Sequence, residues 1–172
     1  MEKRKQYDAK IILRRREERE IPKGKAGIVF CGPPPGGCGA VYYKKSWHHN
    51  LRNYKSFSKD LPVSFVFCPA CEMIKNNQFE GRIIIENIPA KNLEELRHLI
   101  EGFCHRAYLR DPLDRLIKIK KPKADILEVT TTENQLAAKL AKKIKEVFKK
   151  TTEKISYSAS PGDTIYIKMK FK

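Results

Sequence analysis

The sequence predicts an α+β chain in which a small β-rich module precedes a larger α/β domain. Four of the five cysteines fall within residues 28–80, and both pairs follow short runs of β-branched and aromatic residues, "GIVFC" and "VSFVFC". Residues 81–172 instead show clean strand-like and helix-like apolar spacings and contain no cysteine pair. Residues 1–27 are densely charged and have no sustained apolar stripe, which predicts a basic N-terminal arm.

The second cysteine pair, Cys68 and Cys71, has the two-residue spacing of a zinc knuckle. A tight turn of this length brings both thiolates to one tetrahedral ion, while backbone N–H groups point at the sulfur atoms. Cys31 and Cys38 lie upstream at a separation that suits a zinc ribbon, in which two knuckles on successive hairpins face each other. Four thiolates make a closed structural site, so residues 28–80 are predicted to be a zinc-ribbon module that holds one structural Zn²⁺.

The first pair departs from the usual knuckle because the segment "GPPPGG" separates Cys31 from Cys38. Its three prolines have no N–H group to donate to sulfur. Gly39 keeps the cysteine-glycine ending of a knuckle, where the turn needs a positive φ. We therefore expect an expanded knuckle whose loop bulges outward. The alternative is that Cys31 is an unliganded thiol and that His48 or His49 takes its place.

Other uses of the cysteines are disfavoured. The chain shows no signal peptide and no membrane-spanning stretch, which predicts a cytoplasmic protein whose reducing surroundings oppose a disulfide. A thioredoxin-type redox pair at Cys68 and Cys71 needs a helix that opens at the first cysteine inside a βαβ unit, and this segment is short for one. Cys104 falls on the apolar face of a predicted helix, which indicates a buried thiol.

Residues 81–172 predict the element order β-α-β-β-α-β-β. A short β-branched strand ends before Pro89, and a helix follows from Asn92 with Glu95 as its capping partner. A second capping box, Thr132 with Gln135, precedes the most regular amphipathic helix. Apolar residues at about every second position predict the remaining strands, over residues 115–121, 124–130, 154–159 and 164–172. Two β-α-β units most economically form a ferredoxin-like antiparallel sheet with both helices on one face.

The net charge of +16 comes from 36 Lys and Arg residues against 20 Asp and Glu residues and predicts a polyanionic partner. In the RNA interpretation, basic residues take phosphates while Trp47 or Tyr42 stacks on a base. The alternative is that the loop only packs Trp47 on the ribbon. The candidates are Lys44, Lys45, Trp47 and Arg52 between the cysteine pairs, Lys139, Lys142 and Lys143 on the second helix, and Lys168 and Lys170 on the last strand. A catalytic role is disfavoured, because the sequence contains no P-loop, dinucleotide fingerprint or nucleophile elbow.

Three stretches of the chain carry a resemblance to a known family. "CPACEMIKNNQFEGRIIIENIP", "AYLRDPLDRLIKIKK" and "LEVTTTENQLAAKLAKKIKEVF", in this order, resemble an uncharacterised family of small bacterial zinc-ribbon proteins. That family is similar in turn to the N-terminal part of the archaeal and eukaryotic export adaptor of the large ribosomal subunit. The similarity runs from about residue 28 to the last residue, and the widened first knuckle departs from it. It implies that Cys31, Cys38, Cys68 and Cys71 ligate zinc, and that the protein associates with ribosomal RNA or the large ribosomal subunit.

Two functions from different classes follow from the sequence. The first is a non-catalytic, zinc-binding protein that binds ribosomal RNA, with an affinity that falls steeply with salt because neutralised phosphates release counterions. The second is a protein-interaction adaptor in which the sheet face or the ribbon binds an acidic protein and nucleic-acid affinity is incidental. Neither function requires a membrane partner.

Overall fold

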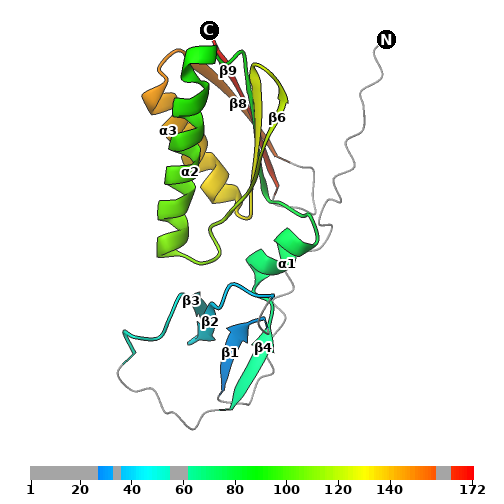
Figure 1. The fold of residues 1–172 in the computed structure, drawn as a ribbon, viewed down its shortest axis with the longest axis vertical. Coiled ribbons are helices and arrows are strands. Elements are labelled where there is room, and N and C mark those ends of the chain that lie inside the picture. The colour runs from blue at the N-terminus through cyan, green and yellow to red at the C-terminus, as the bar shows by residue number, and fades with distance from the viewer. Residues whose placement is uncertain (1–26, 33–35, 55–61, 158–163) are drawn as a thin grey trace.

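The computed structural model describes residues 27–32, 36–54, 62–157 and 164–172 (Figure 1). The predicted basic arm lies outside these residues except for Gly27. The described residues form two sheets and three α-helices, so the prediction of a mixed α+β chain is confirmed. One sheet contains β1 to β4 and the other contains β5 to β9. In Figure 1 the first sheet lies below the second, and helix α1 lies between them.

Four short strands form the sheet of the N-terminal module, in the order β3-β2-β1-β4. They are β1 (Ile28–Cys31), β2 (Val41–Tyr43), β3 (Ser46–His48) and β4 (Val63–Val66). Strand β1 pairs antiparallel with β2 and parallel with β4. Helix α1 (Pro69–Lys75) follows β4 and leads to the second sheet. Both cysteine pairs therefore flank elements of one small sheet.

The second part of the chain combines a five-stranded sheet with two long helices. Its elements are β5 (Gly81–Glu86), a 3₁₀ turn (Ala90–Asn92), α2 (Leu93–Arg110), β6 (Leu116–Lys123), β7 (Ile126–Thr131), α3 (Asn134–Val147), β8 (Thr151–Tyr157) and β9 (Ile165–Phe171). Both long helices lie on one side of this sheet, as the sequence predicts (Figure 1). The core forms between them, from Ile83, Ile85 and Val129 on the strands and Ile100 and Leu140 on the helices, among other buried residues.

The ferredoxin-like strand order that the sequence predicts is not confirmed. The observed order is β6-β7-β5-β9-β8, in which β9 rather than β8 lies beside β5 and runs parallel to it. The two strands of the last hairpin differ in apolar content. Strand β9 buries Ile165, Ile167, Met169 and Phe171, whereas most of β8 is exposed. An interior strand must bury one whole face, so the more apolar strand of the hairpin takes the interior position.

Neither predicted capping box forms. The side chain of Asn92 makes no capping hydrogen bond to α2, and Glu133 rather than Thr132 occupies the N-cap position of α3. The fully buried Thr132 bonds to the segment before β6 instead. Its hydroxyl donates to the Leu113 carbonyl at 2.6 Å and accepts from the Arg115 N–H at 2.9 Å. A buried hydroxyl group must be hydrogen-bonded, so Thr132 bonds to the partners that are available. These hydrogen bonds join the segment before β6 to the turn that precedes α3.

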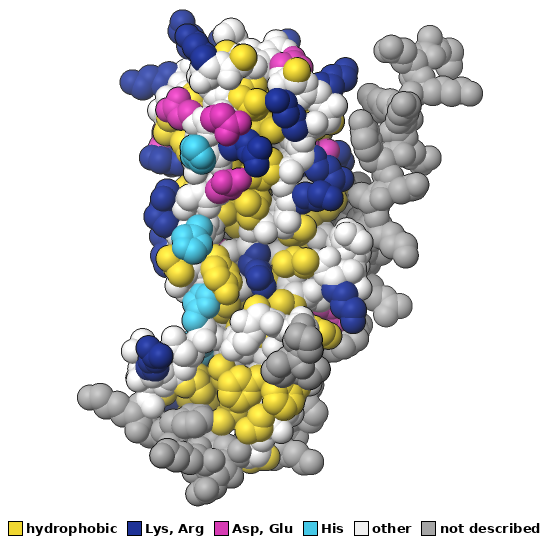
Figure 2. Space-filling model, in the orientation of Figure 1, with side chains coloured by type: hydrophobic (Ala, Val, Ile, Leu, Met, Phe, Trp, Pro, Cys, Tyr) yellow, Lys and Arg dark blue, Asp and Glu magenta, His cyan; other side chains and the backbone are white. Residues whose placement is uncertain are grey.

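The surfaces of the two parts differ in character. Figure 2 shows hydrophobic side chains gathered over the N-terminal module and Lys and Arg side chains spread around the second domain. On β4, Val63 and Phe65 are 54% and 53% exposed. Across the described residues, no helix combines the length and the apolar character needed to span a membrane.

Candidate metal centre

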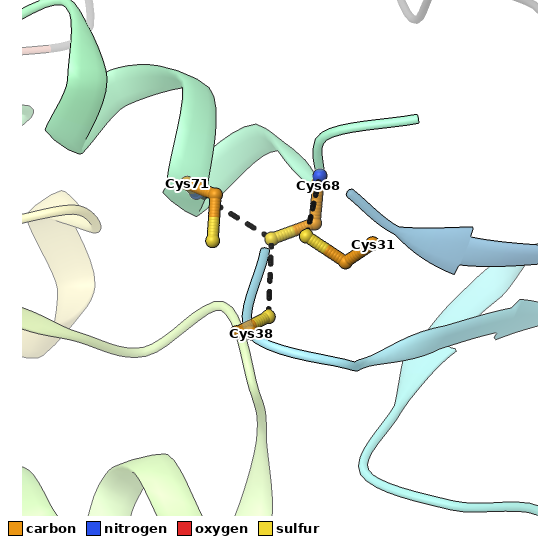
Figure 3. A group of neighbouring side chains, drawn as sticks. All are labelled: Cys31, Cys38, Cys68 and Cys71. Carbon is orange, nitrogen blue, oxygen red and sulfur yellow. Dashed lines mark hydrogen bonds between the residues drawn. The ribbon is translucent and has the colours of Figure 1, made fainter. Parts of the chain in front are cut away.

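The four cysteines of the N-terminal module meet at one point, where β1, β2 and α1 converge (Figure 3). All four sulfur atoms lie within 4.8 Å of one another, and the Cys38 and Cys68 sulfurs are 3.7 Å apart. Four sulfurs around a zinc ion at the usual bond length of about 2.3 Å would be about 3.8 Å apart. No disulfide joins any of the five cysteines in this structure.

The first cysteine pair forms a widened knuckle in which the two ends of the loop lie close together. Cys31 ends β1, and its N–H donates to the Ala40 carbonyl at 2.7 Å on the far side of the loop. Gly39 has the predicted positive φ, +73°. Gly37 passes so close to the Cys31 carbonyl that a Cβ atom could not be accommodated there. These contacts bring the residues that flank "GPPPGG" close together. The six-residue spacing therefore does not keep the Cys31 and Cys38 sulfur atoms apart.

The second pair differs from a hairpin knuckle because it opens a helix. Cys68 is the N-cap of α1, its sulfur accepts from the Cys71 N–H at 3.4 Å, and Pro69 occupies the first turn. The Cys68 N–H in turn donates to the Cys31 sulfur at 3.1 Å. One sulfur atom of each cysteine pair thus accepts a hydrogen bond from a backbone N–H group, as the knuckle spacing predicts. The helix meets one local condition of a redox pair, but β4 and β5 belong to different sheets and no βαβ unit forms.

Ionisation of all four cysteine thiols is unfavourable unless a cation compensates their charge. Burial raises the pKa of the Cys68 thiol and of the Cys71 thiol, and the charge of Cys38 adds to both effects. Burial also opposes ionisation of Cys31, but hydrogen bonds from Cys68 and Cys38 outweigh it and leave the Cys31 pKa lowered. A divalent cation reverses this balance, because a coordinated thiol loses its proton outright. The donor set therefore fits a cation that prefers sulfur ligands.

Neither neighbouring histidine joins the sulfur cluster. The His48 Nε2 atom lies 2.9 Å from the Ser46 hydroxyl and 3.1 Å from the Tyr43 carbonyl oxygen. His49 hydrogen-bonds through Nε2 to the Tyr108 carbonyl, and the two rings meet edge to face at 4.7 Å. Both imidazoles are occupied by other partners, so the alternative in which one of them replaces Cys31 is not supported by the geometry.

Arg115 is the residue of this site that sequence reasoning missed. Its Nη1 atom donates to the Cys71 sulfur at 3.3 Å, and its guanidinium lies 5.2 Å from the centre of the Tyr108 ring. The hydrogen bonds of Thr132 fix the backbone on which Arg115 stands. A local motif could not reveal this contact, because Arg115 is 44 residues from Cys71 and belongs to the second domain.

The sulfur cluster is also the junction between the module and the second domain. Leu113 and Trp47 pack against the buried cysteines, and Trp47 meets Tyr42 edge to face at 5.3 Å. Nearby, a shallow pocket of about 240 Å³ is lined by Glu101, Cys104, His105, Tyr108, Arg115 and Leu116. Burial raises the pKa of Cys104 to about 12, which is consistent with the predicted inert thiol. The half-buried Trp47 thus has a packing role at the junction.

The predicted nucleic-acid contacts do not form one surface. Lys44 and Lys45 occupy the β2–β3 turn with positive φ angles, and the Lys44 ammonium lies 5.5 Å from the centre of the Tyr54 ring. Arg52 is exposed on the loop beyond β3. Lys139, Lys142 and Lys143 lie on α3, on the helix side of the second sheet. Lys168 and Lys170 alternate with the buried residues of β9 and therefore lie on the opposite side.

Comparison of the chain with models of protein families, with curated protein sequences and with solved structures finds no match. The family resemblance of residues 28–172 therefore rests on the quoted sequence stretches. What the structure adds is a group of four cysteines, close enough together to hold a metal ion, at the junction of two sheets.

Proposed function

We propose that the protein is a non-catalytic RNA-binding protein whose N-terminal module is held together by one structural Zn²⁺. The observation that carries the zinc assignment is the approach of four sulfur atoms to within 4.8 Å, with backbone N–H groups aimed at two of them. Sulfur-only tetrahedral sets of this kind are typical of structural zinc. Cys31, Cys38, Cys68 and Cys71 would be its ligands.

A closed set of four thiolates supports a structural role for the ion. Catalytic zinc keeps an open position for water or substrate, whereas four protein ligands fill the coordination shell. Cys31 and Cys68 are also fully buried, so substrate has no route to that side of the cluster. The ion would supply the stability that the short strands of the module lack, because zinc binding contributes about 10–16 kcal/mol in small modules of this type.

The RNA assignment is supported by charge. A net charge of +16 on 172 residues creates a positive field that favours polyanions over other partners. The sequence resemblance narrows the polyanion to ribosomal RNA, most directly that of the large ribosomal subunit. The zinc and RNA assignments are compatible, since a ribosome-associated protein needs phosphate-binding cations and a rigid structure that presents them.

Co-sedimentation with purified ribosomal subunits across a salt series tests this function. We expect saturable binding of the zinc-loaded protein to the large subunit that persists near physiological salt. A Cys68→Ser, Cys71→Ser variant run alongside should lose bound zinc, measured by elemental analysis, and should bind more weakly. Binding that disappears at moderate salt, equally for both proteins, would show that the positive charge is only a non-specific surface.

A second candidate is a protein-interaction adaptor, and the exposed residues of β4 favour it. Val63, Phe65 and Val66 are each at least 40% exposed on an edge strand. Contiguous apolar side chains at a sheet edge are typical of surfaces that bind another protein. A Phe65→Ser variant separates the two functions, because it should leave RNA binding unchanged and abolish a protein complex that survives nuclease treatment.

A further inference from the structure

The face of the five-stranded sheet opposite α2 and α3, which no described helix covers and which is called the open face below, carries a basic surface that the sequence revealed only in part. Directly paired residues of neighbouring strands point to the same side, so the strand registers define rows that run across the sheet. One row is Lys118, Thr130, Arg82, Tyr166 and Ser156, and the next is Lys120, Glu128, Ile84, Lys168 and Lys154. Glu86, Lys170 and Thr152 continue the pattern in a third row. Helices α2 and α3 cover only the other side (Figure 1).

The acidic residues of this face are already paired with two of its cations. Arg82 forms an ion pair with Glu128 at an Nε–Oε1 distance of 3.1 Å, and Lys168 forms one with Glu86 at an Nζ–Oε1 distance of 2.8 Å. Four exposed lysines of the face are left without an ion pair to the described residues, and they are Lys118, Lys120, Lys154 and Lys170. They come from β6, β8 and β9, so they span the sheet from one edge to the other. With strands about 4.8 Å apart, the five strands make a platform about 19 Å wide.

An aromatic side chain lies between these lysines. Tyr166 is half-buried on the interior strand β9, and its ring meets Phe79 edge to face at 6.4 Å and 86°. This contact holds the Tyr166 ring in place beside the sheet. A fixed aromatic ring between cations can stack on an unpaired base while the cations take the adjoining phosphates.

The lysines of α3 form a different kind of surface. They cover one side of an amphipathic helix, where Lys143 pairs with Glu146 and Lys145 pairs with Glu153. No tryptophan, tyrosine or phenylalanine occurs within α3 itself. Such a face attracts phosphates but offers no ring for a base, so it does not favour single strands over duplexes.

We propose that the open face of the five-stranded sheet binds single-stranded RNA, with phosphates on Lys118, Lys120, Lys154 and Lys170 and one base stacked on Tyr166. This inference rests on the proposed RNA-binding function and names the surface and the form of RNA involved. A duplex is disfavoured because its bases are already stacked and cannot reach Tyr166.

The test compares two quadruple variants that change the net charge equally. The sheet variant replaces Lys118, Lys120, Lys154 and Lys170 with Gln. The helix variant replaces Lys139 and Lys142 of α3, together with Lys149 and Lys150 of the turn that follows it, with Gln. Fluorescence anisotropy measures the affinity for a labelled single-stranded oligouridine and for a duplex RNA of the same length across a salt series. Thermal denaturation confirms that both variants fold.

We expect the sheet variant to lose at least tenfold more affinity for the single strand than the helix variant. The slope of log affinity against log salt should fall by about 2.8 if all four lysines contact phosphates, since each single-strand contact contributes about 0.7. Tyr166→Leu should weaken single-strand binding about tenfold with the slope unchanged, and Tyr166→Phe should restore it.

The outcomes separate this inference from the proposed function. If the unmodified protein binds neither RNA, the proposed function itself fails. If it binds RNA but the sheet and helix variants lose affinity equally, RNA binding stands and the assignment to the sheet face is wrong. Tighter binding to the duplex than to the single strand, or an unchanged affinity of Tyr166→Leu, would also overturn the assignment.

Discussion

Arg115 should control how tightly the module binds the proposed zinc ion. Its Nη1 group donates to the Cys71 sulfur at 3.3 Å, which is a hydrogen bond from a positively charged group to the cluster. A hydrogen bond to a charged group contributes about 1.5–3 kcal/mol when it is partly buried. Because about 1.4 kcal/mol corresponds to a tenfold change in an equilibrium constant, Arg115→Gln should weaken zinc binding about 10–100-fold.

Competition with a chromogenic chelator of known affinity measures this change directly. Arg52→Gln is the matched control, because it removes one positive charge from an exposed position of the module itself. We expect Arg52→Gln to bind zinc like the unmodified protein, and Arg115→Lys to lose part of the affinity since it keeps the charge without the planar fork. Equal zinc affinities for Arg115→Gln and Arg52→Gln would refute a role of Arg115 at the cluster.

Four further changes probe the site and the core. Replacing Cys68 and Cys71 together with Ser should remove the zinc and unfold the module while the second domain keeps its thermal transition, as circular dichroism and limited proteolysis would show. In thiol labelling, adding a chelator should expose four reactive thiols, whereas Cys104, with a pKa of about 12, should react only after global unfolding. Gly81→Ala should lower the free energy of unfolding by about 1–3 kcal/mol, because a Cβ atom there overlaps the Thr131 side chain and the helix behind it. Burial and the charge of a neighbouring aspartate raise the pKa of Asp114 above 3.8, so its ionisation destabilises the fold at neutral pH. Asp114→Asn should therefore raise the melting temperature at pH 7, and this gain should vanish as the pH falls towards 3.8.

The cysteine site could be predicted from the sequence because its determinants are local. The spacing of Cys68 and Cys71 specifies a turn, and Gly39 marks the positive φ that ends the first knuckle. The buried faces of the two long helices follow from apolar periodicity for the same reason. What the spacing could not show is that α1 begins inside the second pair, since a seven-residue helix has too few positions to establish a period.

Long-range partners explain the predictions that failed. Thr132 had the spacing of a helix cap, but the segment before β6 offers its buried hydroxyl an acceptor, the Leu113 carbonyl, and a donor, the Arg115 N–H. The position of β9 beside β5 depends on the apolar content of β9 relative to that of β8. The sequence of either strand alone does not predict it. The stronger apolar alternation of residues 165–171 was a usable signal, and weighing it against residues 151–157 would have placed β9 in the interior.

The position of the cysteine cluster also matters for the electrostatics of this strongly basic chain. A zinc ion with four thiolates has a net charge of about −2, which would weaken a positive surface close to it. Arg115 contacts Cys71 of this cluster and would offset part of that charge locally. The lysines of the open sheet face stand on β6, β8 and β9 rather than on the cysteine-bearing elements. The fold thus places the proposed zinc centre and the proposed RNA-binding face on different elements, and Arg115, directly before β6 in the chain, contacts the cysteine cluster.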